Sequence, residues 1–559
     1  MRTILLTLFL LQYLLGSAQS TITLGPYLQS PTANSIKVMW RSDIATGSTV
    51  RYGLDKNNLN LQVTNAQPVN KHMVVLEALQ PFTVYYYAIY DGNTLLAGGD
   101  DEHWFRTFPV AGTAVPTRIW AIGDFGKGNT EQARVRDAYM QYDTVETNLW
   151  LWLGDNAYPD GTEEEYVNKV FDSVYGYKKY MRHMPFIPTP GNHDYNSISP
   201  VTSPQPPLQH SGPYYDFVEV YRNGEAGGVP SGHELYYSFD YGNIHFVNLN
   251  SELGSIFSSS DDWTGVNPLF PFSTSPMKQW LIQDLQANTK PWTIVYFHQP
   301  PYTDGSHEST AFYEVFMRAM RQNYTPILEQ YGVDLVICGH THVYERSFLV
   351  KGAYYGSTQN IGPQHFIQNN SGMDALGEAY KKYTLGANPN QGTVYVNNGN
   401  SGSKEGSANF NHPYMFSEYG CDTCCGSLVL DIQGNRLDGK HLDMSGNIRD
   451  HFTLLKLDEE APVSVQEAIN RGGFSHVVVK PNPFIDQTTV TFRVDWEQQA
   501  TIYLTDINGK RIPIQEKWLE AGEHSLELNV GKLELSRGMY ILHITDGEGH
   551  FLRRMVHVK

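Results

Sequence analysis

The first part of the chain shows short stretches in which apolar and polar residues alternate. Within residues 20–109 this alternation is clearest over Ser35–Trp40 and Thr83–Tyr90, and turn residues separate the stretches. A period of two with frequent turns is typical of antiparallel strands. The pattern therefore predicts a small all-β sandwich over residues 20–109.

The middle of the chain follows a different pattern. Residues 116–455 combine short apolar runs with helical periodicity, as in Glu131–Gln141 and Ser275–Gln286. Strands that alternate with helices predict an α/β sandwich. After a predicted linker at 456–475, alternation returns and predicts a second small antiparallel β-sandwich at 476–559. The predicted fold class is therefore multidomain, with two β-sandwiches around an α/β sandwich.

Five polar motifs accompany five apolar runs in the α/β region. The runs, each of which predicts a buried strand, are Arg118–Ile122, Leu149–Leu153, Phe186–Ile187, Thr293–Phe297 and Asp334–Cys338. The motifs are Gly-Asp-Phe-Gly (123–126), Gly-Asp-Asn-Ala-Tyr (154–158), Gly-Asn-His-Asp (191–194), Val-Tyr-Phe-His (295–298) and Gly-His-Thr-His (339–342). Loops at the carboxyl ends of strands in an open α/β sheet converge on one crevice, so these side chains should meet.

The residue types in the motifs favour a metal site. Each motif alone is weak, because Gly-Asp is an ordinary turn and a single histidine is more often buried and hydrogen-bonded. The strongest single feature is the pair His340 and His342, because a spacing of two places both on one side of an extended segment. Two Asp, one Tyr, one Asn and at least three His suit two metal ions better than one.

These motifs resemble those of the purple acid phosphatases, a branch of the calcineurin-like dimetal phosphoesterases. The resemblance covers roughly residues 117 to 455, and it includes Tyr237–Gly242 and Gly339–Ser347. Its most specific element is Tyr158, three residues after Asp155. The resemblance implies Asp124, Tyr158 and His342 as ligands of one metal, Asn192, His298 and His340 as ligands of the other, and Asp155 as the bridge.

The ligand types suggest which metals bind. A phenol has a pKa of about 10, so Tyr158 can ionise at acidic or neutral pH only on a strongly acidic metal such as ferric iron. The neutral set Asn192, His298 and His340 suits a divalent ion such as zinc, iron or manganese. Three negative ligand charges against five metal charges leave about +2, which suits a phosphate dianion.

The resemblance also implies a reaction. A metal-bound hydroxide would attack the phosphorus of a phosphate monoester in line. His193 lies beside Asn192 outside the ligand set, so it is the first candidate for the general acid. Family members carry two further substrate residues about nine and ten positions after the histidine of the fourth motif, here His307 and Glu308. Some members have a second histidine where Glu308 stands, which leaves the proton donor open.

The predicted function is an exported dimetal acid phosphatase acting on small phosphate esters. Two alternatives remain: a phosphodiesterase or nucleotide pyrophosphatase on the same site, and a surface binding protein with a vestigial enzyme domain. The intact ligand set argues against the second alternative. A formal net charge of −18 argues against a general binder of nucleic acid or acidic membranes.

Both ends of the chain indicate export. Arg2 and the apolar run Ile4–Leu15 predict a secretory signal peptide over residues 1–18. The run is short for a membrane span, and no other stretch is apolar enough, so we expect no transmembrane segment in the mature chain. Residues 476–559 resemble the C-terminal sorting domain of type IX secretion, through Pro-Asn-Pro-Phe (481–484), Asp-x-x-Gly-Lys (506–510) and Gly-x-Tyr (538–540). This resemblance implies the type IX machinery as a partner and passage through the periplasm to the surface or medium.

Two further features give expectations. Segment Leu79–Tyr87 resembles the end of a fibronectin type III domain. The polar insertions at 196–233, 253–275 and 355–412 are expected to line or cover the substrate mouth, because such long loops in compact domains are usually functional or disordered. One disulfide is expected from the cluster Cys421, Cys424 and Cys425, and Cys338 is expected to be a packed core residue.

Overall fold

The structure is a computed structural model. It describes residues 20–195, 212–252, 275–311, 313–355, 361–385, 388–460, 474–494, 496–506, 510–545 and 550–557. The predicted signal peptide, most of the second insertion and part of the first lie outside these residues. The chain forms two compact units: one contains nearly all of the chain up to Leu457, and the other contains the C-terminal region with two short segments, 362–364 and 383–389. No helix in the described part is long and apolar enough to span a bilayer.

The N-terminal domain is antiparallel throughout. Its strands are β1 (Ile22–Gln29), β2 (Ile36–Gly53), β3 (Leu61–Leu76), β4 (Val84–Asp91), β5 (Thr94–Gly98) and β6 (Trp104–Arg106). The strand order is β1-β2-β4-β5, with β3 on β2 and β6 on β4. Alternate side chains, among them Trp40, Val50 and Tyr87, are fully buried between the strands. This agrees with the period-two pattern of the sequence.

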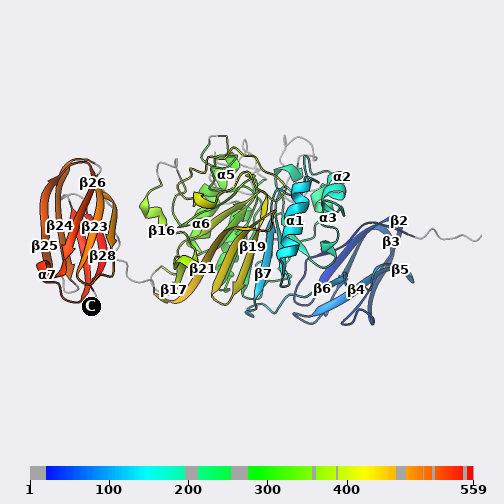
Figure 1. Cartoon of the computed structure of the whole chain (residues 1–559). Coiled ribbons are helices and arrows are strands. Elements are labelled where there is room, and N and C mark those ends of the chain that lie inside the picture. Colours follow the sequence, from blue (N-terminus) through cyan, green and yellow to red (C-terminus); the bar gives the residue numbers. More distant parts are fainter. Residues whose placement is uncertain are drawn as a thin grey trace, which may run out of the picture. The chain divides into compact units, whose positions relative to one another are not determined.

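The central domain is built on two sheets (Figure 1). The first has the order β10-β11-β12-β13-β18-β14: β10 (Tyr237–Tyr241), β11 (Ile244–Asn248), β12 (Trp292–Tyr296), β13 (Leu335–Cys338), β18 (Val394–Asn398) and β14 (Tyr344–Arg346). The second has the order β17-β21-β20-β19-β7-β8-β9: β17 (Tyr380–Leu385), β21 (Ile448–Glu460), β20 (Arg436–Asp443), β19 (Gly426–Gln433), β7 (Thr117–Ile122), β8 (Leu149–Leu153) and β9 (Phe186–Thr189). The five strands expected beside the motifs are β7, β8, β9, β12 and β13, and within each sheet these strands run parallel.

The helices begin where the sequence provides caps. The main helices are α1 (Thr130–Tyr142) and α4 (Pro276–Ala287), with shorter ones at α2 (Glu163–Glu165), α3 (Pro213–Phe217), α5 (Val315–Ala319) and α6 (Thr325–Gln330). The side chain of Asn129 accepts a hydrogen bond from the first turn of α1, and Ser275 does the same for α4. Both long helices therefore agree with the predicted helical patterns.

The strand sequences explain why both sheets are buried. β8 reads Leu-Trp-Leu-Trp-Leu, and all five side chains are inaccessible to solvent. Such a continuous apolar run is expected of a parallel strand covered on both faces. Trp152 of β8 stacks on Phe186 of β9 with ring centroids 3.9 Å apart. The ends of these strands, which carry the motifs, are thus fixed by a dense aromatic core.

The third predicted insertion is a loop only in part. The segment 355–412 also contains β16 (Phe366–Gln368), β17 and β18. Strand β18 pairs with both β13 and β14 inside the first sheet, and its five residues are buried. The alternating run around Val394 and Val396 is too short to stand out among the Gly and Asn residues that surround it.

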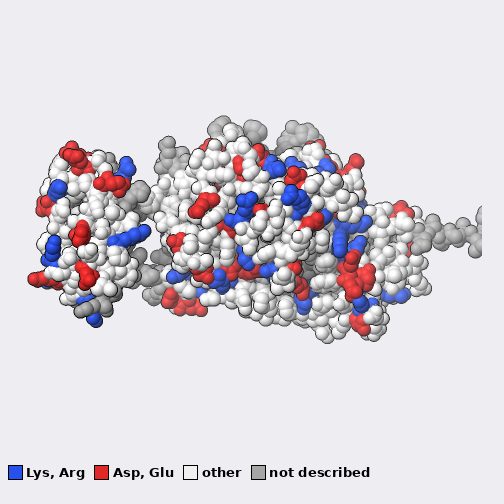
Figure 2. All heavy atoms as spheres, in the orientation of Figure 1, with Lys and Arg blue, Asp and Glu red and all other residues white. Residues whose placement is uncertain are grey.

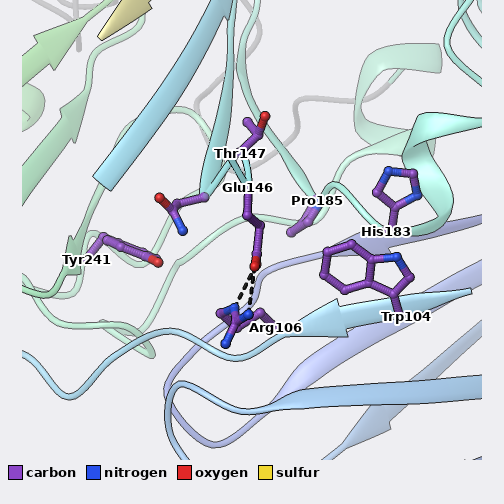
Figure 3. Close-up of a pocket in the computed structure, with 8 residues that line it drawn as sticks. Trp104, Arg106, Glu146, Thr147, His183, Pro185 and Tyr241 are labelled. Carbon is purple, nitrogen blue, oxygen red and sulfur yellow. Dashed lines mark hydrogen bonds and ion pairs between the residues drawn. The ribbon is translucent and has the colours of Figure 1, made fainter. Parts of the chain in front are cut away.

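The N-terminal and central domains share a contact surface. Figure 3 shows the ion pair across it, in which the Arg106 guanidinium lies 2.7 and 2.6 Å from the two carboxylate oxygens of Glu146. The Trp104 ring stacks on His183 beside this pair. The side chain of Gln29 is fully buried and donates to the carbonyl of Phe186. Figure 2 shows acidic and basic side chains interspersed over the visible face of the central domain.

The C-terminal unit has a core of its own. Its sheets are β22-β23-β26 and β25-β24-β27-β28: β22 (Phe474–Lys480), β23 (Gln487–Val494), β26 (Gly522–Asn529), β25 (Arg511–Leu519), β24 (Gln498–Asp506), β27 (Gly538–Thr545) and β28 (His550–His557), with a short α7 (Val530–Leu533). Their buried side chains pack in a separate cluster that includes Val490, Leu504 and Leu542. Because β21 continues to Glu460, the first residues of the predicted linker belong to a strand.

The cysteines behave as the sequence indicates. Cys421 and Cys424 form a disulfide, which is one of the pairs available within the predicted cluster. Cys425 and Cys338 are free and buried.

Candidate metal centre

The polar motifs lie at the ends of the parallel strands, and their backbone conformation is unusual. Asp124, Asp155 and His340 have positive φ angles of 56°, 52° and 69°. Residues other than glycine adopt this left-handed region uncommonly, and it tends to occur where a site constrains the chain. Three of the predicted ligands therefore occupy sharp turns directly after a strand.

The hydroxyl of Tyr158 marks the meeting point of the first predicted ligand set. It lies 2.9 Å from Oδ1 of Asp124, 2.9 Å from Oδ2 of Asp155 and 3.1 Å from Nε2 of His342. The Tyr158 side chain is buried and reaches this point from the loop after β8. All four residues that the resemblance assigns to the first metal, including the bridging Asp155, therefore converge.

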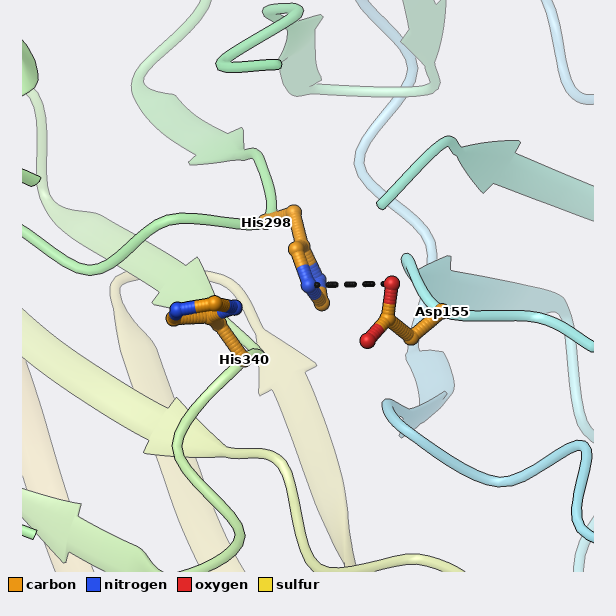
Figure 4. A group of neighbouring side chains, drawn as sticks. All are labelled: Asp155, His298 and His340. Carbon is orange, nitrogen blue, oxygen red and sulfur yellow. Dashed lines mark ion pairs between the residues drawn. The ribbon is translucent and has the colours of Figure 1, made fainter. Parts of the chain in front are cut away.

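The second predicted set lies on the other side of Asp155 (Figure 4). The Oδ1 oxygen of Asp155 is 3.3 Å from Nε2 of His298. One ligand atom from each of Asp155, His298 and His340 lies within 4.8 Å of the others. Nδ1 of His340 is 3.0 Å from Oδ1 of Asn192, which completes the set. Asp155 thus faces Tyr158 with one oxygen and His298 with the other, as a bridging ligand requires.

Glycines in the motifs provide space for this approach. A Cβ atom on Gly191 would lie 2.3 Å from Oδ1 of Asp155, and one on Gly339 would lie 2.6 Å from Oδ2 of Asp124. Any side chain at either position would push a carboxylate out of the cluster. The glycines are therefore needed for the ligands to come together.

The hydrogen bonding of His298 leaves its Nε2 nitrogen available to a cation beside Asp155. Its Nδ1 donates to the carbonyl of Leu153 at 2.8 Å, so Nε2 faces Asp155. Nε2 is buried and has no hydrogen-bond partner among the described residues. A histidine fixed by a backbone carbonyl on one nitrogen and free on the other is the usual arrangement of a metal ligand.

The electrostatics of the cluster also favour a bound cation. Burial disfavours the charged form of His298, but Asp155 and Asp124 raise its pKa well above the usual value. Burial, together with His298 and His307, lowers the pKa of His340 well below the usual value. Burial and the same two carboxylates raise the pKa of Tyr158 well above 10. The cluster attracts positive charge, and its oxygen and imidazole donors fit a pair of metal ions.

Two carboxylates that the sequence reasoning did not single out support the ligands. Asp194 is buried and accepts hydrogen bonds from the Gly191 amide at 2.7 Å and the Asn156 side chain at 2.9 Å. Oε1 of Glu405 lies 2.8 Å from Nδ1 of His342 and orients that ring. Asp194 could have been suspected because it ends the third motif, whereas Glu405 lies in a distant insertion without a recognisable pattern.

His193 lies at the edge of the cluster. Its backbone amide donates to Oδ1 of Asp155 at 2.8 Å, and its Nδ1 lies 2.5 Å from the carbonyl oxygen of Pro159. Its ring lies 4.5 Å from the ring of Tyr158, and 31% of its side chain is exposed. The structure therefore places His193 beside the ligands and within reach of solvent.

The structure separates the two remaining candidates. The ring of His307 lies 4.5 Å from that of His340, and its Nδ1 is 2.7 Å from Oε1 of Glu314. Glu308 instead points outward: it is exposed, and its carboxylate accepts a hydrogen bond from Thr310. His307 thus reaches the cluster, and none of the described contacts of Glu308 does.

Family models match three regions of the chain. The description "Calcineurin-like phosphoesterase" matches residues 117–344, which contain all the predicted ligands. This part of the chain is therefore similar to the calcineurin-like phosphoesterases. Residues 24–107 match "Purple acid Phosphatase, N-terminal domain", and residues 478–559 match "Secretion system C-terminal sorting domain". The resemblances drawn from the sequence motifs are therefore confirmed.

Individual relatives carry the same family name. The chain is 26% identical over 288 residues to purple acid phosphatase 1 of Ipomoea batatas, covering 51% of this chain and 53% of the relative. It is 24% identical over 342 residues to Fe(3+)-Zn(2+) purple acid phosphatase 12 of Arabidopsis thaliana, covering 59% and 65%. The chain thus spans about half the length of the first of these curated relatives and under two thirds of the second.

Solved structures share the fold. The purple acid phosphatase PPD1 of Lupinus luteus superimposes with a TM-score of 0.55 at 17% identity, over 77% of this chain and 74% of that one. PhoD superimposes with a TM-score of 0.54 at 14% identity, over 80% and 94%. The fold class is therefore as predicted.

Proposed function

We propose that this phosphoesterase is an exported acid phosphatase that hydrolyses small phosphate monoesters at a centre of ferric iron and one divalent ion. The observation that carries the proposal is the position of the Tyr158 hydroxyl, within 3.1 Å of Asp124, Asp155 and His342. Few uses other than ligation explain a buried phenol between two carboxylates and an imidazole. The printed name of the Arabidopsis relative, an Fe(3+)-Zn(2+) enzyme, supports the choice of metals.

The environment of Tyr158 supports a trivalent ion. Burial and the neighbouring carboxylates oppose loss of the phenolic proton, so only a strongly acidic metal would displace it. Asn192, His298 and His340 carry no negative charge and would hold the divalent ion. Bound there, the two ions would supply an activated water and neutralise charge on the phosphoryl group.

The surrounding residues would bind and protonate the substrate. His193 can present its ring at the open edge of the site while its backbone amide stays bonded to Asp155. From that position it would give a proton to the leaving oxygen, a contribution of about 10²–10⁴-fold. His307, held by Glu314 beside His340, would contact the phosphate or serve as the second candidate donor. The exposed Glu308 is the weakest of the three proposed catalytic residues.

The proposal is tested by comparing two activated substrates. The metal-loaded enzyme should hydrolyse p-nitrophenyl phosphate far faster than bis(p-nitrophenyl) phosphate, with a bell-shaped profile and an acidic optimum. A preference for the diester would instead favour the phosphodiesterase alternative. No hydrolysis of either by protein carrying both metals would favour the surface binding protein.

The ligand assignment is tested by metal content. Asp155→Ala should lose both ions, because this carboxylate faces both ligand sets. Asn192→Ala should lose mainly the divalent ion and keep iron. Glu308→Gln serves as the matched control and should keep both ions, since its side chain bonds Thr310. Full divalent occupancy in Asn192→Ala would refute the proposed split.

The proton donor is tested by the leaving group. His193→Ala should slow alkyl phosphates, whose leaving groups need protonation, much more than aryl phosphates. Equal losses on both would mean that His193 binds phosphate or supports the ligands. The same comparison on His307→Ala and Glu308→Gln would then locate the donor.

A further inference from the structure

A lysine outside the ligand set lies against Tyr158. Nζ of Lys127 is 3.6 Å from the centroid of the phenol ring. Lys127 is partly buried, and none of the ion pairs among the described residues includes it. A cation at this distance from an aromatic face is attracted to the π electrons of the ring. The ammonium group thus lies over the ring face of Tyr158, and it also interacts electrostatically with the carboxylates of Asp124, Asp155 and Glu405.

The backbone fixes this contact. The carbonyl of Gly126 accepts a hydrogen bond of 2.9 Å from the amide of Tyr158, which joins the two motif loops. A Cβ atom on Gly126 would lie 1.9 Å from the carbonyl oxygen of Asn156, so the loops meet as closely as their backbones allow. On the other side, the ammonium group of Lys169 donates to the carbonyl of Tyr158. The stem of Lys127 therefore starts from a rigid position beside the ring.

We propose that Lys127 is a positioning residue that sets how strongly Tyr158 donates electrons to its metal. This inference rests on the proposed function. A positive charge over the ring lowers the energy of the ring electrons by the Coulomb interaction. Transfer of an electron from Tyr158 to ferric iron then requires more energy. Lys127 should thereby place the visible absorption band at shorter wavelength than the ligand set alone would give.

The test compares the visible spectra of the iron-loaded wild type and Lys127→Met. Methionine keeps most of the apolar stem and removes the charge. The band should move to longer wavelength by on the order of 10–30 nm, as expected for one charge near the ring at an effective dielectric constant of about 20. Lys127→Arg should keep the wild-type band. Lys169→Met is the matched control, because Lys169 contacts the carbonyl of Tyr158 and not its ring.

Iron content is measured on every variant, so that a shift of the band can be distinguished from loss of the metal. An unmoved band in fully iron-loaded Lys127→Met overturns the inference, as does an equal shift in Lys169→Met. If Lys127→Met loses iron, Lys127→Gln is measured in its place. Loss of iron from both neutral variants but not from Lys127→Arg would mean that the charge holds the ligand set together rather than tuning the band, and it would overturn the inference, as would loss from all three. A wild type that carries iron without any visible band would instead refute the proposed ferric centre.

Discussion

The two β-sandwiches of this protein have similar alternating sequences but different cores. In the C-terminal sandwich, the described buried apolar residues form a cluster of their own. In the N-terminal sandwich, Leu24, Tyr27 and Phe108 belong to the core of the central domain. The ring centroid of Tyr27 is 5.0 Å from that of Phe171 and that of Phe108 is 4.8 Å from that of Tyr241.

Buried polar groups reinforce this difference. Gln29 uses its amide nitrogen on the carbonyl of Phe186 and its carbonyl on the amide of Glu219. The hydroxyl of Tyr87 donates to the carbonyl of Arg182. Such contacts satisfy buried groups that water can no longer reach. The same period-two pattern therefore occurs in a domain that shares its core with the central domain and in a domain that has a core of its own.

The largest effect is expected from removal of residues 20–109. This would expose the aromatic residues against which Tyr27 and Phe108 pack, and it would leave polar groups at the interface without partners. We predict that the remaining chain is insoluble or lacks a cooperative thermal transition. Size-exclusion chromatography and thermal scanning check this. A monomer with both metals and wild-type activity would show that the N-terminal domain is dispensable.

A smaller effect is expected from Gln29→Ala. The substitution leaves the carbonyl of Phe186 and the amide of Glu219 without this partner, and each unsatisfied buried group costs about 1–3 kcal/mol. Denaturant unfolding of the full chain should show a corresponding decrease in the free energy of unfolding. The control is Gln499→Ala in the C-terminal sandwich. The Gln499 side chain is exposed and donates a hydrogen bond to Glu516, so the free energy of unfolding should change by no more than about 0.5 kcal/mol. Equal effects of the two variants would remove the proposed difference.

The ion pair between Arg106 and Glu146 should contribute less. Its geometry is bidentate, but the two side chains are 28% and 31% exposed, so water and salt screen it. Arg106→Met should cost up to about 1 kcal/mol, and less at high ionic strength. A double-mutant cycle with Glu146→Gln measures the coupling. A coupling well above that range would mean that this pair, rather than the buried groups, dominates the interface.

The smallest effect on stability and on the proposed activity is expected from truncation after residue 473. Every proposed site residue and the whole core of the central domain lie before this point. Thermal stability and activity of the truncated protein should match those of the full chain. In the native host it should accumulate in the periplasm, because the matched sorting domain is missing. Unchanged delivery to the surface or medium would refute the proposed sorting role.

The sequence was sufficient to predict features that depend on neighbouring residues, such as the strands that carry the motifs. The apolar runs before Asp124, Asp155 and His340 predicted strands, and parallel topology then brought the motifs together. It was insufficient where contacts span hundreds of residues. Glu405 reaches His342 from an insertion, and nothing in its surroundings indicated this.

Side-chain direction was also beyond the sequence. The resemblance placed both His307 and Glu308 among the substrate residues. In the structure, the ring of His307 lies beside that of His340, whereas the carboxylate of Glu308 accepts a hydrogen bond from Thr310. Likewise, alternation alone could not reveal that Tyr27 packs in the core of the next domain. Both outcomes depend on the path of the loops and on the neighbours they meet.

The most direct test measures iron, the divalent metal and the visible spectrum of the purified oxidised protein, beside Tyr158→Phe. We predict one iron and one divalent ion per chain and a pink to violet colour, because the Tyr158 hydroxyl lies where Asp124, Asp155 and His342 meet. The phenylalanine variant should lose the colour and retain some activity, since the phenol is a ligand rather than the nucleophile. A colourless, iron-free wild type with full activity would contradict the ferric assignment.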